Sequence, residues 1–334
     1  MKQFNNAAMN PITVSAPGKL MLFGEHAVVY GHPCIVTAVG QRMFLTVQTL
    51  NSKLLTLNSP EVNVTNYSKL LDQLGEGEMP KGARFIEIAV KNFSEKYTVK
   101  SGLQITTRSE FASTFGFGSS SASTVCTIKA LSELFDLKLS NKEIFDLSYK
   151  TVLDVQGKGS GFDVAAAIYG GSLLFFTGGK EITPLTINHL PVIIGYSGIK
   201  ADTVRLIEKV AEKAEKEPEV VEDIYKRIEQ IVEKAKTAIE KSDFEEAGKL
   251  MTENQLLLSQ LDVSSEKLDA MIQAARDAGA YGAKLSGAGG GDCMIALRNA
   301  QGKPAVEKAI ERVGGQVIDV ETNVEGVRVE NKQM

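Results

Sequence analysis

Two glycine-rich segments are the parts of this sequence best suited to bind a ligand. Residues 286–293 read Ser-Gly-Ala-Gly-Gly-Gly-Asp-Cys, and residues 116–121 read Gly-Phe-Gly-Ser-Ser-Ser. Glycine loses more conformational entropy on folding than other residues, so such loops are kept where a chain turns sharply or lets a ligand reach its amides. A strand-to-strand turn would explain residues 286–293 taken alone. Together with Lys19, in the segment Ala-Pro-Gly-Lys, the two loops favour a nucleotide-binding enzyme.

The loop at 116–121 lies between a predicted strand and a predicted helix, so it would sit at a helix N-terminus. Unpaired amides and the positive end of the helix dipole together bind anions at such a place. Its glycines would let phosphate oxygens approach the backbone, and its serine hydroxyls could bind phosphate or a metal. The residues concerned are Gly116, Gly118, Ser119, Ser120 and Ser121. The loop lacks the Gly-Lys-Ser/Thr ending of a Walker motif, and an N-capped helix without a ligand is the structural alternative.

Lys19 lies between apolar runs, where a solvated lysine is unexpected. The partners that we consider for its charge are Glu25 and Asp163. A strand lysine whose ammonium reaches water is the structural alternative. Asp163 opens a small-residue helix after a glycine-rich turn, so it is either a helix N-cap or a general base beside a lysine. A Lys–Asp pair would favour the charged form of both groups.

Metal-binding and disulfide patterns are weak in this chain. The three histidines, His26 among them, are far apart at positions 26, 32 and 189, which disfavours a zinc site. The three cysteines, at 34, 126 and 293, contain no Cys-x-x-Cys pair. Their odd number and wide spacing are typical of a reducing compartment.

Composition sets further bounds. At 334 residues, with 43% hydrophobic and 23% charged residues, the chain suits two globular domains. A net charge of −4 disfavours nonspecific nucleic-acid binding, which needs a basic surface. No apolar run approaches the roughly 18–20 residues that span a bilayer, and residues 1–11 lack a signal-peptide core. We therefore expect a cytoplasmic protein with neither a nucleic-acid nor a membrane partner.

Apolar periodicity predicts an α+β protein. Strands are predicted at 14–23 (two short ones around a Pro-Gly break), 34–39, 42–47, 103–108, 173–176, 192–196, 316–320 and 326–329, and on both sides of residues 286–293. Helices are predicted at 83–97, 122–135, 141–155, 164–168, 203–216, 220–241, 244–261, 264–279 and 306–313. Residues 51–81 are predicted to be a polar connection with one short helix. We place a domain boundary between residues 1–182 and 183–334.

These elements, in this order, resemble the GHMP kinases, a family named for galactokinase and the homoserine, mevalonate and phosphomevalonate kinases. The resemblance covers nearly the whole chain. It implies a two-domain fold, with an N-terminal α/β domain that carries an unusual βαβ phosphate-loop unit and a ferredoxin-like α+β C-terminal domain. It also implies ATP and Mg²⁺ as cofactors, a small-molecule alcohol as substrate, and a homodimer.

Within the family the resemblance is mixed. Residues 15–31, above all the ending Glu-His-Ala-Val-Val-Tyr-Gly, resemble mevalonate kinases, as do residues 256–269, although Asp262 stands where those enzymes have Gly. Residues 155–171 resemble phosphomevalonate kinases, and so does Asp292 before Cys293, where mevalonate kinases more often have Gly. The resemblance implies phosphorylation of the mevalonate 5-hydroxyl in isoprenoid precursor synthesis. The alternatives are a phosphomevalonate kinase and a homologue that binds small molecules without catalysis.

The resemblance also assigns roles to single residues. Lys19 matches the lysine beside the reacting hydroxyl, Asp163 the catalytic aspartate, and Ser120 the serine that helps to hold Mg²⁺. Residues matching the substrate side are Glu25, His26 and Thr203. Residues 116–121 match the phosphate-binding motif, and residues 287–291, with Gly289 at their centre, match the third motif beside the nucleotide.

Some positions depart from the family pattern. The metal-binding Glu of mevalonate kinases lies eleven residues before the catalytic Asp, and here that position is Val152. We expect Asp154 to take its place as a metal ligand. In the phosphate-binding motif, Ser113 or a neighbour replaces the leading Pro, Phe117 replaces Leu, and Ser121 replaces Ala.

Overall fold

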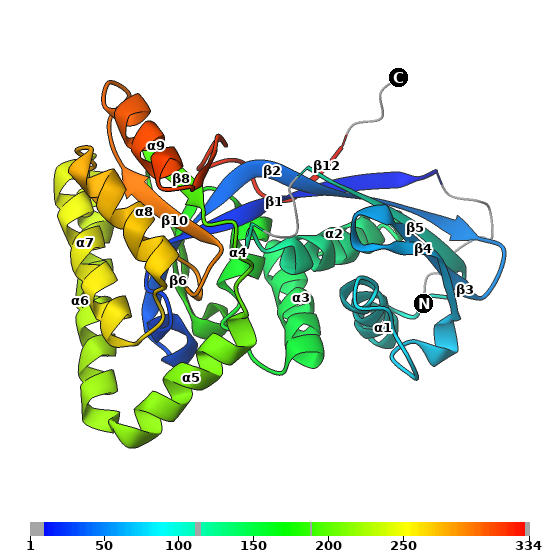
Figure 1. Cartoon of the computed structure of the whole chain (residues 1–334). Coiled ribbons are helices and arrows are strands. Elements are labelled where there is room, and N and C mark those ends of the chain that lie inside the picture. Colours follow the sequence, from blue (N-terminus) through cyan, green and yellow to red (C-terminus); the bar gives the residue numbers. More distant parts are fainter. Residues whose placement is uncertain (1–9, 111–114, 188, 331–334) are drawn as a thin grey trace.

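Two sheets organise the chain in the computed structural model, which describes residues 10–110, 115–187 and 189–330. Ser113 lies outside the described residues. Within them, the first sheet has eight strands in the order β12-β1-β2-β5-β3-β4, with β6 paired to β2 and β7 to β6. The second has four strands in the order β11-β8-β10-β9 (Figure 1).

Long strands form the centre of the first sheet. They are β1 (Ile12–Phe23), β2 (Pro33–Leu50) and β5 (Gly102–Ser109). β1 pairs antiparallel with β2 along most of its length, and the register shifts between Pro17 and Gly18. The Pro-Gly pair therefore makes an irregularity within one strand, whereas the sequence predicted a break between two.

The prediction for residues 51–81 is wrong. This stretch forms β3 (Leu54–Ser59) and β4 (Val64–Leu70), which pair with each other, and β3 runs parallel to β5. Leu55 and Leu57 are fully buried while Leu54, Thr56 and Asn58 beside them are half-buried, which is the alternation of a one-sided strand. The mostly exposed side chains of β4 concealed this pattern.

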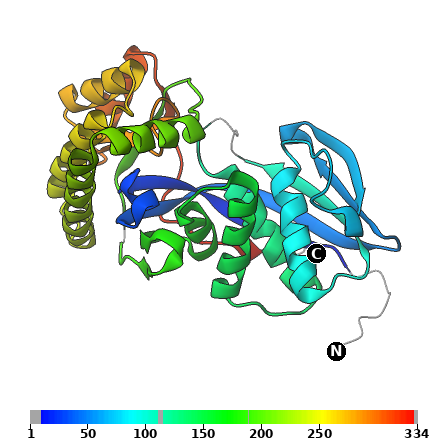
Figure 2. The same ribbon diagram turned by 90° about the horizontal axis from the view of Figure 1, so that it is seen from below.

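Helices cover one face of the first sheet (Figures 1 and 2). They are α1 (Arg84–Tyr97), α2 (Ser119–Leu134), α3 (Asn141–Gln156) and α4 (Phe162–Tyr169). α2 is almost wholly buried, because its many Ser, Ala, Thr and Cys residues let neighbouring elements approach closely. α3 begins with a capping box in which Ser140 and Glu143 bond each other's backbone N–H groups. Short 3-10 helices occupy Ala27–Tyr30, Pro60–Val62, Leu71–Gln73 and Thr177–Gly179.

The second half is an antiparallel sheet covered by helices, as predicted. Its strands are β8 (Val192–Tyr196), β9 (Gly282–Ser286), β10 (Cys293–Leu297) and β11 (Gln316–Ile318). Its helices are α5 (Thr203–Lys216), α6 (Pro218–Glu240), α7 (Phe244–Gln260), α8 (Glu266–Asp277) and α9 (Lys303–Arg312). α6 and α7 run side by side at the left of Figure 1. In the described part of the chain, no helix is long and apolar enough to cross a membrane.

The chain returns to the first sheet after the second is complete. β6 (Ser172–Phe176) and β7 (Ile182–Pro184), which precede the second sheet in the chain, belong to the first sheet. After the second sheet, β12 (Arg328–Val329) pairs with β1. The buried Arg42 guanidinium of β2 donates to the carbonyls of Glu325 (2.9 Å) and Gly326 (2.7 Å), which fixes this returning segment. The division into residues 1–182 and 183–334 stays a prediction. A boundary drawn by sheet membership would place β7 and β12 with the first half.

Candidate active site

The predicted phosphate loop ends at the N-terminus of a buried helix. α2 begins at Ser119, so the serines of the loop form its first turn. Gly118 is the N-cap, with φ of 79°, and no side-chain hydrogen bond caps this end. The N–H of Ala122 donates to the Gly118 carbonyl at 3.0 Å, so the N–H groups of Ser119, Ser120 and Ser121 precede that bond. This geometry suits an anion.

Lys19 reaches this loop from β1. Its ammonium donates to the Gly116 carbonyl (2.7 Å) and lies 5.3 Å from the centre of the Phe162 ring. A Cβ added to Gly118 would lie 3.2 Å from Lys19 Cγ and 3.6 Å from Asp163 Cβ, so glycine lets the loop approach both side chains. Burial lowers the pKa of the Lys19 ammonium, and the carboxylates of Asp163 and then Asp292 oppose that shift. The ammonium is therefore partly buried, and the nearby carboxylates favour its charged form.

Asp163 lies in the first turn of α4, beside the loop. The N-cap of α4 is Gly161, so the N-cap alternative for Asp163 is wrong. Its Oδ2 accepts a hydrogen bond from the Ser121 hydroxyl at 2.5 Å, and its Oδ1 accepts one from the Val164 N–H at 3.0 Å. No ion pair within 4.0 Å joins it to Lys19, both being among the described residues. The structure brings the two groups to the same side of the loop without direct contact.

Glu25 is not the partner of Lys19 that the sequence suggested. It pairs with Lys284 of β9, and not with Lys19. Glu25 is 1% exposed and Lys284 is fully buried, and the Lys284 ammonium also donates to the Leu285 carbonyl at 2.5 Å. Burial raises the pKa of Glu25 and lowers that of Lys284, and each shift is opposed by the charge of the partner. The second carboxylate oxygen of Glu25, Oε2, is buried without a hydrogen-bond partner.

Sequence reasoning missed Lys284, although a signal was present. Lys284 stands in an apolar strand between Ala283 and Leu285, which is the argument applied to Lys19. Its partner lies 259 positions away, so only the fold reveals the pair.

His26 links the segment that follows β1 to residues 287–291. Its Nε2–H donates to the Ala288 carbonyl at 2.9 Å, and burial lowers the pKa of the imidazole, which favours the neutral ring. His26 has φ of 60°, which is unusual for a residue other than glycine and is typical of functional segments. The Ser286 hydroxyl donates to the Met21 carbonyl of β1 at 2.8 Å, so the end of β9, just before residues 287–291, is docked on the strand that carries Lys19.

Two other predicted residues lie outside these contacts. Thr203 is exposed at the first position of α5. Gly289 is buried, and a Cβ there would lie 2.0 Å from the Val263 carbonyl oxygen, so this glycine permits close backbone packing. Their predicted roles toward substrate and nucleotide stay predictions.

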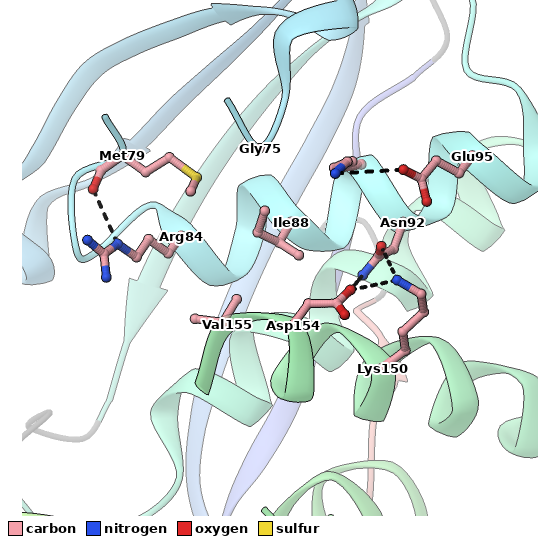
Figure 3. A pocket seen from close by; sticks show the side chains of 10 residues that line it. Gly75, Met79, Arg84, Ile88, Asn92, Glu95, Lys150, Asp154 and Val155 are labelled. Carbon is pink, nitrogen blue, oxygen red and sulfur yellow. Dashed lines mark hydrogen bonds and ion pairs between the residues drawn. The ribbon is translucent and has the colours of Figure 1, made fainter. Parts of the chain in front are cut away.

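Asp154 lies in a cavity of about 390 Å³ between α1 and α3 (Figure 3). Its Oδ2 accepts hydrogen bonds from the Lys150 ammonium (2.6 Å) and the Asn92 amide (2.9 Å). Asp154 therefore has local partners, and no hydrogen bond joins this described residue to Ser120 or Asp163. Among the described residues there is no group of three or more His, Cys, Asp or Glu residues that could hold a metal ion.

Comparisons with known proteins place the chain in a family. The model of the GHMP kinases N terminal domain matches residues 84–171, and that of the GHMP kinases C terminal matches residues 235–317. The mevalonate kinase of Pyrococcus abyssi is 36% identical over 331 residues, which cover 96% of this chain and 98% of that enzyme. The chain belongs to the GHMP kinase family. A mevalonate kinase of Archaeoglobus fulgidus is 33% identical to this GHMP kinase over 95% of the chain and 99% of that enzyme.

Solved structures agree with this assignment. The Methanococcus jannaschii mevalonate kinase superposes on this GHMP kinase with a TM-score of 0.79 at 27% identity, covering 98% of this chain and 100% of that one. The Lactococcus lactis galactokinase, solved with galactose, has a TM-score of 0.82 at 18% identity, covering 96% and 95%. The latter shares the fold alone. The predicted two-domain GHMP kinase fold is confirmed.

Proposed function

We propose that this GHMP kinase is a mevalonate kinase, which transfers the γ-phosphate of ATP to the 5-hydroxyl of mevalonate in isoprenoid precursor synthesis. The observation that carries the proposal is the similarity to enzymes named mevalonate kinase over 96% of the chain. The galactokinase comparison limits what the fold alone supports, because related folds accept different alcohols.

The start of α2 supports ATP binding. Its uncapped N-terminus and the positive φ of Gly116 and Gly118 fit a phosphate group that approaches the backbone. We assign the ATP phosphates to residues 116–121, with Gly289 in the supporting third motif. A bound Mg²⁺ would neutralise phosphate charge, and such ions are often held by one or two protein ligands, substrate phosphates and water. The Ser120 hydroxyl fits that donor set, whereas Asp154 would first have to leave Lys150.

The residues around the loop suit phosphoryl transfer, which depends on positioning and electrostatics. We assign Asp163 as the group that accepts the proton of the attacking hydroxyl. Lys19, on the same side of the loop as Asp163, would stabilise the developing alkoxide, because burial strengthens the effect of its charge. Glu25 and His26 would orient the acid substrate, with Thr203 on the same side.

A substrate panel tests the proposal. The purified protein, with ATP and Mg²⁺, is assayed on mevalonate and 5-phosphomevalonate side by side, together with Asp163→Ala and Lys19→Met. We expect turnover on mevalonate, and a loss of about 100-fold or more in each variant. Lys129→Met is the matched control, because Lys129 is a partly exposed lysine of α2 that pairs with Glu133, and this variant should keep wild-type turnover.

Each other outcome has a definite meaning. Faster turnover on 5-phosphomevalonate would replace the proposal with a phosphomevalonate kinase. ATP binding without turnover on any alcohol would support a homologue that has lost catalysis. Near-wild-type turnover in both site variants would show that the roles of Asp163 and Lys19 are wrong.

We also propose a cytoplasmic location and a homodimer. The location is supported by the three buried free thiols, of Cys34, Cys126 and Cys293, which are typical of a reducing compartment. The dimer rests on the family resemblance, and light scattering of the purified protein tests it.

A further inference from the structure

Asp292 is tied to the segment that connects β8 to α5. Its N–H donates to the Ile199 carbonyl (2.7 Å), and its carbonyl accepts from the Ser197 N–H (2.9 Å), which extends the pairing of β8 with β10. Its Oδ1 accepts from the Ala201 N–H (3.0 Å). Asp292 has φ of 53°, a backbone conformation that glycine adopts more readily. The aspartate side chain therefore adds one tether that glycine at this position could not make.

The other carboxylate oxygen of Asp292 lies against the phosphate loop. A Cβ added to Gly116 would lie 2.5 Å from Asp292 Oδ2 and 2.9 Å from its Cγ. The carbonyl of Gly116 is the acceptor for the Lys19 ammonium. Asp292 thus lies between the segment that leads into α5 and the phosphate loop whose Gly116 carbonyl accepts the hydrogen bond of Lys19.

We propose that Asp292 is a positioning residue for phosphoryl transfer, which holds residues 197–201 beside the phosphate loop and places a second negative charge near Lys19. The proposal rests on the proposed kinase function. The tether holds the start of α5, where Thr203 lies, close to the loop. The charge supplements that of Asp163 on a lysine that burial would otherwise drive toward its neutral form.

Two substitutions separate the tether from the charge. Asp292→Asn keeps an oxygen that can accept from the Ala201 N–H and removes the charge. Asp292→Gly removes both and suits the positive φ, so the fold should be retained. Asp136→Gly is the matched control, because exposed Asp136 has φ of 49° in the turn after α2. It should leave the kinetics unchanged.

The pH profile of turnover reports the charge. The groups that act on Lys19 are Asp163, Asp292 and Cys293, which raise its pKa, and Lys200, which lowers it. Turnover that needs the Lys19 ammonium falls as the pH rises through that pKa. Removing the Asp292 charge therefore moves the alkaline limb to lower pH in both variants. An unmoved limb in both would overturn the charge part of the proposal.

The KM for the acceptor and amide exchange report the tether. Asp292→Gly should raise the acceptor KM about tenfold or more, as expected for a lost hydrogen bond to a charged group, while Asp292→Asn changes it little. Hydrogen exchange at the Ala201 N–H, measured without substrate, should speed up in the glycine variant alone. Wild-type exchange there would overturn the tether even if the kinase assignment fails. Faster exchange with no wild-type turnover on mevalonate would reject the proposed function and keep the tether.

Discussion

Breaking the buried pair of Glu25 and Lys284 should be far more harmful than removing it whole. Glu25→Gln leaves a fully buried ammonium with no counter-charge, and Lys284→Met leaves a buried carboxylate. Removing one partner of a buried pair costs about 3–5 kcal/mol, whereas replacing both with neutral groups of similar volume is often close to neutral. We expect each single variant to lose that amount of unfolding free energy, and the double variant to lie within about 2 kcal/mol of the wild type.

Urea unfolding followed by far-UV circular dichroism measures this cycle, and the signal suits a chain that contains no Trp. The matched control is Lys129→Met, because the ammonium of Lys129 lies 2.5 Å from Glu133 but the pair is partly exposed. A pair of that kind contributes about 1 kcal/mol or less. Single variants at Glu25 and Lys284 that cost no more than the control would refute the reasoning. So would a double variant whose loss equals the sum of the single losses.

Three further outcomes follow from single contacts. Gly289→Ala should destabilise the protein more than Gly287→Ala in urea unfolding. Both glycines have positive φ, which costs an alanine about 1–2 kcal/mol, but only at Gly289 would the new Cβ meet a backbone oxygen. Equal losses of unfolding free energy in the two variants would contradict this. Hydrogen bonds from the Ser140 hydroxyl and N–H lower the pKa of Glu143. The capping box therefore stabilises α3 fully at pH values above the ordinary carboxyl pKa, and this stabilisation is lost as the pH falls through the lowered pKa of Glu143. Ser140→Ala should raise the Glu143 pKa in an NMR titration, and an unchanged value would count against the box. Arg42→Lys should cost about 1–3 kcal/mol in urea, because lysine cannot reproduce the guanidinium bonds to two carbonyls, and a neutral result would show that the returning segment is held otherwise.

Local signals in the sequence predicted much of the fold. β8 and α5 match the predicted ranges to the residue, and α3 begins at the predicted residue 141, because periodicity is a property of neighbouring residues. The β3–β4 hairpin was missed because its stability depends on β5, more than 40 positions along the chain, and because β4 exposes most of its side chains. Pairing with a distant strand leaves little trace in a local window.

The candidate site divides in the same way. Lys19, Asp163 and residues 116–121 were predicted from local segments, and the structure gathers them around Gly118. The pairing of Glu25 with Lys19 that the sequence suggested is wrong, because nothing near Glu25 in the sequence points to Lys284. Asp292 was noticed as a departure from the family pattern, yet its contacts depend on how β10 meets the end of β8. The chemical roles of all these residues stay predictions.

The pairing of β12 with β1 has a consequence for synthesis. β1 leaves the ribosome more than 300 residues before Arg328 and Val329, which pair with Ser15 and Val14 at its outer edge. During that interval the edge of β1 presents unpaired backbone groups, and such edges recruit strands of other chains. A product that stops before Glu325 would keep this edge open, and the Arg42 guanidinium would lack the carbonyls of Glu325 and Gly326 that it normally binds. The chain therefore completes its first sheet late, so truncated copies should aggregate more readily than the full-length chain.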